Sequence, residues 1–544
     1  MTNRNRTGTV IWLIAVICSV INVAFAAQVE TPMVQDLDGG GYEIYNVYDV
    51  VAKGPSADVR AYGAIGNGIA DDTDAIQDAI DENRSVLIPQ GYVFMVSGLV
   101  VPENRTLFGG GSLRQIAGSS SALVDVQGDN VTIRHLELDG ASVGTGLPGI
   151  MADAVISNLK IINCHVHHCT HSGILVKQVQ DVLISNNYSH DNAHPSEAFG
   201  DGIYISETTN AVISENIIRD NKRDGIVVTK KVADSEFVVV ANNIIEGHTA
   251  WSTAAIWLEL NDNNGKTSIV GNVCRGNRNG IMATDQDTSV TIVGNAIEGQ
   301  PGQSPYIGDG IFARGGVVSN NTIKYQGNGI ASDASNTLII EGNHIADVHG
   351  QGIHVIGPQM DASCKLTIAD NQVFNAAYGI RLSVSSGNLY NLVITGNQTR
   401  KKDGGAWGLR IDSNQAANCI DNAIVANNNF TDSTACIVSN YPSQIGRAIF
   451  SNNIGASVQT VSADTTVSFQ ETVLVNASGG PRTITLPKPA NGRIVTIKKI
   501  DSSANTVTIQ NNSGETIDGA AAYSLPAQWS TMTVGSDGTN WYVK

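Results

Sequence analysis

Short apolar segments separated by polar corners repeat along most of the chain. One recurring phrase is apolar-x-x-Asn, and its asparagines stand about 26 residues apart on average. A second phrase, Gly-Ile-x-apolar, recurs between them. The asparagines are Asn163, Asn187, Asn216, Asn243, Asn272, Asn295, Asn321, Asn343, Asn371, Asn397, Asn428 and Asn453. The second phrase begins at Gly173, Gly202, Gly225, Gly280, Gly310, Gly329, Gly352 and Gly379, and continues as Gly408-Leu409.

The spacing within each repeat predicts strands. Apolar residues such as Ile226 and Val228 alternate with outward positions, and the segments are too short for helices. Short strands at a constant period predict an all-β chain coiled into a parallel β-solenoid, whose turns stack at about 4.8 Å. We expect the repeated asparagines at one corner of every turn, in the left-handed conformation, with their amides hydrogen-bonded along the column.

Composition excludes several classes of protein. The chain has 544 residues, of which 42% are hydrophobic and only 15% charged, so it is neither disordered nor a charged coiled coil. The net charge of −17 excludes a broad basic surface, and no nucleic-acid partner is predicted. Six cysteines beyond residue 26 are too sparse to be a disulfide framework.

Residues 1–26 have the features of a signal peptide. Arg4 and Arg6 precede an apolar run at 10–24, and Ala24-Phe25-Ala26 supplies a small-x-small cleavage site. The segment predicts export to a secreted, periplasmic or cell-surface location. An uncleaved anchor is the alternative, and only then would the membrane be a partner.

The rest of the chain divides into three predicted parts. Residues 27–56 form an N-terminal arm and residues 57–456 the solenoid. A helix near 72–83, apolar at Ile76, Ala79 and Ile80, is expected to cap the open end of the coil. In residues 457–544 Thr, Val and Ser alternate, which predicts a small C-terminal antiparallel β module.

A family resemblance begins near the predicted helix. Residues 58–80, DVRAYGAIGNGIADDTDAIQDAI, and 86–91, VLIPQG, closely resemble the opening of the pectate lyase-like, right-handed parallel β-helix superfamily. That superfamily includes rhamnogalacturonases, polygalacturonases, alginate epimerases and phage tailspike depolymerases. The resemblance implies a right-handed coil, with the active site on the Gly-Ile strand and the turn before it. Residues 34–46 and the C-terminal part are similar to phage tail chains, which keeps a homotrimer open.

Strand alternation places two columns of side chains on the outer face of the Gly-Ile strands. Aromatic faces can stack on sugar rings, and guanidinium groups can clamp carboxylates. The predicted substrate-binding residues are Lys230, Trp257, Glu259, Arg314, His354, Arg381 and Arg410.

Four residues are candidates for catalysis. Asp201 and Asp224 occupy the same place in adjacent turns, so stacking would raise the pKa of one of them, as suits an acid and a base. Asp-Gly is also ordinary turn chemistry, and Asn residues share the column. His194, in the long segment before Asp201, and Tyr204 are candidates for proton transfer.

Histidines cluster around residues 165–194 without a recognisable metal-binding pattern. The set is His165, His167, His168, His171, His190 and His194. Their spacing matches no standard zinc motif, and a strand points alternate residues to opposite faces, so no metal site is predicted. No cofactor is identified, although a cation such as Ca²⁺ would neutralise a bound uronate.

These features lead to one functional hypothesis and one alternative. The first is a secreted carbohydrate-active enzyme, a lyase, a glycoside hydrolase or an epimerase, acting on an acidic polysaccharide in a groove on the solenoid. In a hydrolase Asp201 and Asp224 would be acid and base; in a lyase Tyr204, His194 or Lys230 would abstract the proton. The alternative is a non-catalytic glycan-binding adhesin or tailspike-like protein.

Overall fold

The computed structural model describes residues 56–544, apart from 145, 194–199, 231–236, 251, 261–265, 285–289, 301–307, 334–335, 358–364, 385–388, 402–406, 414–419, 433–434, 440–445 and 456. The predicted signal peptide, nearly all of the predicted arm and His194 lie outside this part of the chain. Within it, no helix combines the length and apolarity that a bilayer crossing requires.

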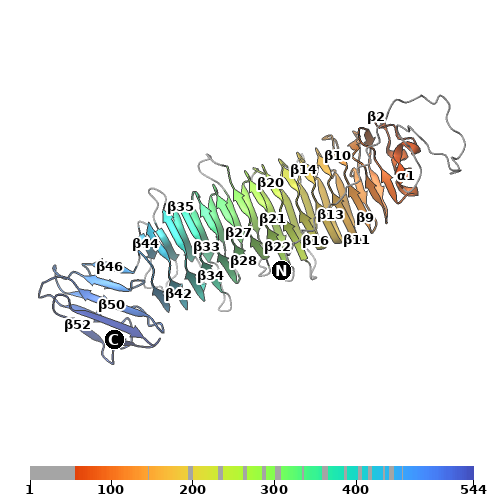
Figure 1. The fold of residues 1–544 in the computed structure, drawn as a ribbon. Coiled ribbons are helices and arrows are strands. Elements are labelled where there is room, and N and C mark those ends of the chain that lie inside the picture. Colours follow the sequence, from red (N-terminus) through yellow and green to blue (C-terminus); the bar gives the residue numbers. More distant parts are fainter. Residues whose placement is uncertain are drawn as a thin grey trace, which may run out of the picture.

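The chain coils into a long parallel β-solenoid with three strands in most turns (Figure 1). A 15-stranded sheet forms one side, here called the short-strand stack, and a 28-stranded sheet wraps the other two sides. We call the two sides of the larger sheet the Gly-Ile stack and the third stack. The predicted all-β parallel solenoid is therefore confirmed.

The short-strand stack contains β2 (Asn67–Asp71), β4 (Val93–Val96), β7 (Ser112–Gln115), β10 (Glu137–Asp139), β12 (His165–His167), β14 (Tyr188–His190), β17 (Ile217–Arg219), β20 (Ile244–Glu246), β23 (Val273–Arg275), β26 (Ala296–Glu298), β29 (Thr322–Lys324), β32 (His344–Ala346), β35 (Gln372–Ala376), β39 (Gln398–Lys401) and β43 (Asn429–Asp432). The Gly-Ile stack contains β5 (Leu99–Val101), β8 (Val124–Val126), the first halves of β11 (Ile150–Ile162) and β13 (Ile174–Ser185), β15 (Ile203–Ser206), β18 (Ile226–Lys230), β21 (Ala254–Leu260), β24 (Asn279–Ala283), β27 (Asp309–Ala313), β30 (Asn328–Ser332), β33 (Gln351–Gly357), β36 (Tyr378–Val384), β40 (Trp407–Ser413) and β44 (Ala435–Ser439).

The third stack contains β1 (Ala57–Asp58), β3 (Ser85–Leu87), β6 (Thr106–Phe108), β9 (Val131–Arg134), the second halves of β11 and β13, β16 (Thr209–Ser214), β19 (Phe237–Ala241), β22 (Lys266–Val270), β25 (Val290–Val293), β28 (Gly316–Ser319), β31 (Leu338–Glu341), β34 (Leu366–Ala369), β38 (Leu392–Thr395), β42 (Ala423–Ala426) and β45 (Ala448–Ser451). A further two-stranded pair joins β37 (Leu389–Tyr390) to β41 (Ile420–Asp421).

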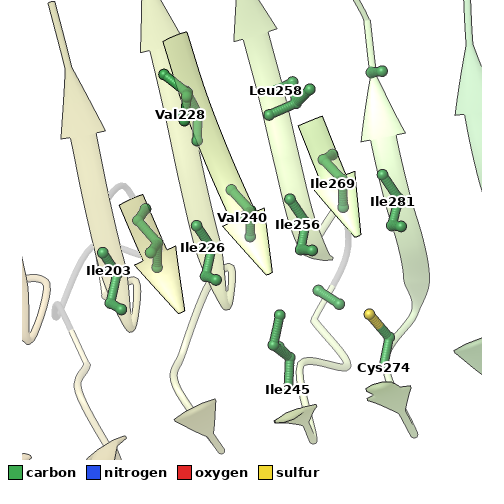
Figure 2. Packing of buried hydrophobic residues seen from close by; sticks show 14 of the residues in the cluster. Ile203, Ile226, Val228, Val240, Ile245, Ile256, Leu258, Ile269, Cys274 and Ile281 are labelled. Atoms are coloured by element: carbon green, nitrogen blue, oxygen red, sulfur yellow. The ribbon is translucent and has the colours of Figure 1, made fainter. Parts of the chain in front are cut away.

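Stacked aliphatic side chains form the core of the coil. Ile203, Ile226, Ile256 and Ile281 follow one another at the same place in β15, β18, β21 and β24, and all are fully buried (Figure 2). Each such side chain contributes about 1.5–3 kcal/mol through removal of apolar surface from water. The column of isoleucines therefore stabilises the stacking of one turn on the next.

The glycine of each Gly-Ile phrase is required by close packing. A Cβ at Gly280 would lie 2.6 Å from Cγ2 of Ile297, which belongs to the short-strand stack. At Gly225 a Cβ would overlap Ile245 Cγ2 in the same way. Only glycine lets the chain approach this closely as it enters the strand.

The predicted asparagine ladder forms inside one corner of the coil. Each amide donates from Nδ2 to Oδ1 of the next asparagine at 2.8–3.0 Å, from Asn187 through to Asn453. The left-handed conformation, however, belongs to the residue before each ladder asparagine, such as Glu215 or Asn242, and not to the asparagine itself. The prediction was wrong on that point.

Asn163 is not a member of the ladder. It takes the left-handed conformation, and the backbone N–H of Cys164 donates to Asn187 Oδ1 at 2.9 Å. Cys164 therefore occupies the ladder position in that turn. It is a buried free thiol, as are Cys169 and Cys274, and burial raises the pKa of all three to about 12.

Helix α1 (Thr73–Glu82) lies at the N-terminal end of the coil (Figure 1). Ile76, Ala79 and Ile80 are buried in the main core, as the pattern predicts. The two acids before the helix have different partners. Asp71 Oδ1 accepts the backbone N–H of Thr73 at 3.0 Å. Asp72 instead accepts the backbone N–H groups of Ile65 and Gly66, which follow the 3₁₀ helix Val59–Tyr62.

The C-terminal part builds a second hydrophobic core of its own, between Val461 and Trp541. One sheet contains β46 (Val458–Val461), β48 (Thr472–Val475), β50 (Ile494–Lys499), β53 (Thr531–Ser536) and β54 (Trp541–Val543), and the other contains β47 (Thr465–Thr466), β49 (Arg482–Thr485), β51 (Val507–Gln510) and β52 (Ala522–Leu525). The predicted antiparallel pairing is wrong in part, because β46–β48–β50 and β47–β49–β51 pair in parallel and only the last strands pair antiparallel. Strand alternation is the same in both directions, so the sequence pattern could not separate them.

A buried arginine joins this module to the last turn of the coil. Arg493 donates to the carbonyl of Ala448 at 3.2 Å and to that of Ser468 at 2.5 Å. Its guanidinium lies 5.4 Å from the ring centroid of Phe450. Burial lowers the pKa of Arg493 to about 9. The module is thus bonded to the end of the coil opposite α1.

Candidate functional site

Strand register confirms the first of the two outward columns predicted for the Gly-Ile stack, from Leu175 to Arg410. Tyr204 pairs with Val227, which pairs with Trp257 on the next strand. Farther along, His354 pairs with Arg381, which pairs with Arg410. Trp257, His354, Arg381 and Arg410 therefore belong to one face.

Asp201 and Asp224 form a buried carboxylate pair beside Arg223. Both aspartates are 0% exposed. Asp201 Oδ1 accepts the backbone N–H of Asp224 at 3.2 Å, and Oδ2 accepts the hydroxyl of Ser172 at 3.2 Å. Asp224 Oδ1 accepts the N–H of Ala254 at 2.6 Å. Arg223 Nε lies 3.1 Å from Asp224 Oδ2 and 3.9 Å from Asp201 Oδ1.

Both carboxyls titrate above their ordinary range. Burial raises the pKa of Asp201. Burial, followed by repulsion from Asp201, raises the pKa of Asp224 to about 7, although the Ala254 N–H and Arg223 act in the opposite direction. Asp224 can therefore hold a proton near neutral pH, which is a property of a general acid.

The same column has a structural role farther along the coil. Asn279 Oδ1 accepts the N–H of Asp309 at 3.0 Å, and Asn328 Oδ1 accepts that of Gln351 at 3.1 Å. Asn328 also donates to Asp309 Oδ1 at 2.8 Å. A side-chain oxygen at this position thus satisfies the backbone of the next turn, whether or not it is charged.

The remaining catalytic candidates lie close to the pair in sequence. Tyr204 is half-buried on β15, and its hydroxyl lies 3.2 Å from Thr229 Oγ1. Lys230 ends β18, but its side chain lies outside the described residues, as does the whole of His194.

Trp257 and Glu259 extend the face on β21. Trp257 is half-buried, and its indole N–H is buried without a partner among the described residues. Glu259 is exposed. Arg314, just after β27, is paired with Asp333 at 2.7 Å and donates to the carbonyl of Thr284 at 2.6 Å. All three residues therefore keep some surface available to a ligand, and the Arg314 side chain, 35% exposed, is oriented by its two partners.

An arginine–aromatic cluster occupies the C-terminal end of the same face; we use this name for Tyr378, Arg381, Trp407, Arg410 and Asp412. The Tyr378 and Trp407 rings stack with centroids 4.9 Å apart. The Arg410 guanidinium lies 4.2 Å from the Trp407 centroid, and that of Arg381 lies 5.3 Å from the Tyr378 centroid. Asp412 accepts Nε of Arg381 at 2.9 Å and Nε of Arg410 at 2.7 Å. One carboxylate thus orients two guanidinium groups.

His354 lies beside this cluster in the neutral form. Its Nε2 lies 3.0 Å from Ser383 Oγ. Burial, with a contribution from the nearby Arg381, lowers the pKa of His354 to about 4. Its imidazole can therefore exchange hydrogen bonds with a ligand without adding charge.

The histidines gather on a different face, the outer side of the short-strand stack. His165 and His167 lie on β12, next to Glu137 and Asp139 of β10 on one side and Tyr188 and His190 of β14 on the other. Sequence reasoning noted these histidines but missed that the acids of the preceding turn come into register with them. In both β10 and β12 an apolar residue stands between two polar ones, and this shared alternation could have shown that the acids and the histidines face the same side.

A second internal ladder was also missed. Asn192 donates to Asn221 Oδ1 at 2.8 Å, and His248 Nδ1 lies 2.9 Å from Asn277 Oδ1. His248 is fully buried, and burial lowers its pKa to about 4. No regular phrase marks these positions, because His248 interrupts the asparagines.

Comparisons with known proteins agree with the fold. A family model described as a right handed beta helix region matches residues 114–264, and one described as a periplasmic copper-binding protein (NosD) matches residues 197–359. The pre-neck appendage protein of Bacillus phage phi29 is 34% identical over 121 residues, which cover 20% of this chain and 14% of that protein. The chain therefore matches only about one seventh of that relative's length.

Two solved structures give low overall similarity. The mannuronan C-5 epimerase AlgE4 A-module of Azotobacter vinelandii is 19% identical, with 68% of this chain and 94% of that chain covered and a TM-score of 0.38. The exopolygalacturonase of Thermotoga maritima is 11% identical, with 88% and 95% covered and a TM-score of 0.37.

The described part of the segment matched by the copper-binding family model contains no cluster of metal-ligating side chains. Among the described residues of 197–359, no three His, Cys, Asp or Glu side chains converge closely enough to hold an ion. The groups that do converge lie between residues 137 and 168.

Proposed function

We propose that this chain, a member of the right-handed parallel β-helix superfamily, is an exported protein that binds an acidic polysaccharide along the outer face of the Gly-Ile stack. The observation that carries the proposal is the arginine–aromatic cluster. In a chain with a net charge of −17, two arginines and two stacked aromatic rings are held together on this face.

The chemistry of the cluster fits a uronate sugar. Guanidinium groups bind carboxylates through paired hydrogen bonds, and aromatic rings offer flat apolar faces to pyranose rings. Arg381 and Arg410 keep 28% and 25% of their side chains exposed. Asp412 fixes both Nε atoms and neutralises only one of the two positive charges, so the cluster retains a net attraction for an anionic polymer.

Removal of both guanidinium groups tests the proposal. The double variant R381A/R410A should weaken binding to an acidic polysaccharide at least about tenfold, because each charge-assisted hydrogen bond contributes about 1.5–3 kcal/mol. Affinity electrophoresis or calorimetry on a panel of uronate polymers measures this effect, with a neutral glucan as a specificity control.

Arg447→Ala is the matched control. Arg447 is also paired with an aspartate, Asp421, at 2.8 Å, but it precedes β45 of the third stack. A loss of binding free energy in R447A about half as large as in R381A/R410A, in proportion to the charges removed, would show that only overall charge matters and would remove the cluster from the binding site.

Trp257 tests whether the polymer extends along the face. Trp257→Ala should weaken binding by about 1–3 kcal/mol, the hydrophobic contribution of one large side chain. Affinity and thermal unfolding are measured on the same variant. A lower melting temperature with unchanged affinity would mean that Trp257 only fills space under its own loop.

Catalysis on the bound polymer is the second candidate function, supported by the raised pKa of Asp224. In a hydrolase Asp201 and Asp224 would be acid and base, and in a lyase or epimerase Tyr204, His194 or Lys230 would take the proton. The full burial of both aspartates favours binding without cleavage. A screen of acidic polysaccharides, monitored for unsaturated products and for reducing ends, distinguishes an enzyme from a protein that only binds the polymer.

Export and assembly complete the proposal. Residues 1–26 support delivery to the periplasm, the cell surface or the medium. The resemblance of residues 34–46 and of the C-terminal part to phage tail chains is the ground for proposing a homotrimer. Light scattering on the purified protein determines the subunit number.

A further inference from the structure

The outward histidine cluster combines nitrogen and oxygen donors from three consecutive turns. Glu137 and Asp139 come from β10, His165 and His167 from β12, and His190 from β14. The cluster lies on the short-strand stack, away from the outer face of the Gly-Ile stack, and it is independent of the proposed glycan site.

The donor atoms are already close to one another. His167 Nε2 lies 3.2 Å from Glu137 Oε1, and His165 Nδ1 lies 4.0 Å from the same oxygen. One donor atom from each of these three residues fits within 4.8 Å of the others. His190 Nε2 lies only 2.6 Å from His165 Nε2.

Neighbouring side chains orient the rings. His190 Nδ1 donates to Asp191 Oδ2 at 2.7 Å, which leaves the Nε2 lone pair directed at His165. His167 Nδ1 lies 2.6 Å from His168 Nδ1, and Asp139 Oδ1 lies farther away at 3.7 Å, itself held by Arg114 at 2.7 Å. Hydrogen-bond partners on the second ring nitrogen fix the orientation of ligating imidazoles in metal sites, and His190 and His168 take these places behind His165 and His167.

We propose that Glu137, His165 and His167 bind one divalent transition-metal ion on the outer face of the short-strand stack, with His190 behind His165 as its hydrogen-bond partner.

The donor set selects the class of metal. Two imidazole nitrogens with one carboxylate suit Zn²⁺, Cu²⁺ or Ni²⁺, whereas Ca²⁺ requires six to eight oxygen ligands. His167 has 10% of its side chain exposed and His165 has 40%, so the site is built into the surface and remains open to solvent on one side. An ion there would connect the side chains of successive turns.

Metal binding is measured on the untagged full-length chain after treatment with a chelator. Equilibrium dialysis against Zn²⁺, Ni²⁺ and Ca²⁺ separately, with metal analysis, should give one Zn²⁺ or Ni²⁺ per chain and no comparable Ca²⁺. His165→Ala and His167→Ala should each lower the affinity by more than the roughly 10–100-fold typical of losing an outer-shell partner. Asp139→Asn should fall within that range.

The matched control is His344→Ala. His344 lies on β32 of the same sheet and has Gln372 Oε1 at 3.4 Å from its Nδ1, with no second histidine paired to it in that register. This variant should bind the ion as the wild type does. Circular dichroism of each variant confirms that the fold is retained.

Two further readouts keep the test independent of any single variant. Zn²⁺ should raise the melting temperature of the wild type but not that of His165→Ala, because only the folded site binds the ion. Bound Cu²⁺ should show nitrogen coupling in its electron paramagnetic resonance spectrum. Absence of stoichiometric binding, or binding that persists in both histidine variants, would overturn the proposal and leave a network of hydrogen-bonded imidazoles.

Discussion

Replacing Asn243 by alanine is expected to lower the free energy of unfolding by about 3–6 kcal/mol. Asn243 Oδ1 accepts the N–H and the Nδ2 of Asn216 at 3.0 and 2.9 Å, and its own Nδ2 donates to the carbonyl of Ile213 at 3.0 Å and to Asn272 Oδ1 at 2.9 Å. The residue is 0% exposed. The substitution leaves two or three buried polar groups without partners, each at a cost of about 1–3 kcal/mol.

The effect should be local before it is global, because each turn of a solenoid contacts only its neighbours. Amide hydrogen exchange should therefore increase first in β16, β19 and β22, followed by a lower urea midpoint. Asn512→Ala is the control, since Asn512 is an exposed asparagine of the C-terminal module and its replacement should change stability by less than about 0.5 kcal/mol. An unchanged midpoint in Asn243→Ala would mean that the ladder adds nothing to stability.

The ladder also shows why so much of this fold could be predicted from sequence. A solenoid repeats one set of local requirements, so an amide inside a corner, a glycine under an isoleucine and an alternating strand recur at a readable period. Register follows from that repetition. The column that contains Tyr204, Trp257 and His354 could therefore be aligned by counting from each Gly-Ile phrase, and the strand pairing agrees with it.

The errors arose where more than one residue type can satisfy the same structural requirement. Left-handed backbone at the corner is taken by Asn, Gly, Glu or Asp, so the ladder asparagine was confused with its neighbour. Asn163 matched the phrase while Cys164 held the position. The arginine–aromatic cluster was only half predicted, because Tyr378 and Trp407 stand before the glycine, at positions that aspartate and asparagine occupy elsewhere.

Asp224 is the residue at which structural and catalytic interpretations can be separated, and Asp224→Asn is the informative variant. The amide retains an oxygen for the N–H of Ala254, and Asn279 and Asn328 already serve the same position. The substitution also removes a negative charge at position 224, which burial and repulsion from Asp201 disfavour in the folded chain. We therefore expect the variant to fold and to be more stable than the wild type above pH 7.

The pH dependence has a defined sign. The pKa of Asp224 is raised from 3.8 to about 7 in the folded chain, so between these values the folded state holds a proton that the unfolded state has released. Stability contributed by this carboxyl is complete below pH 3.8 and is lost as the pH rises to about 7, by on the order of a few kcal/mol. Urea unfolding at intervals from pH 4 to 8 should show this decline in the wild type and a flatter profile in Asp224→Asn. Asp153→Asn, on an exposed aspartate paired with Lys177, should keep the wild-type profile.

Turnover measured on the same variant decides between the two candidate functions. If Asp224 donates or accepts a proton during cleavage, Asp224→Asn should lose on the order of 100-fold or more in rate, the usual contribution of a general acid or base, while glycan affinity stays unchanged. A structural carboxyl predicts the stability change alone, with the same rate as the wild type or with no turnover in either protein. Because the neutral amide fits the column, lost activity could not be attributed to unfolding, and a stabilised variant that still cleaves its polymer would exclude Asp224 from the chemistry.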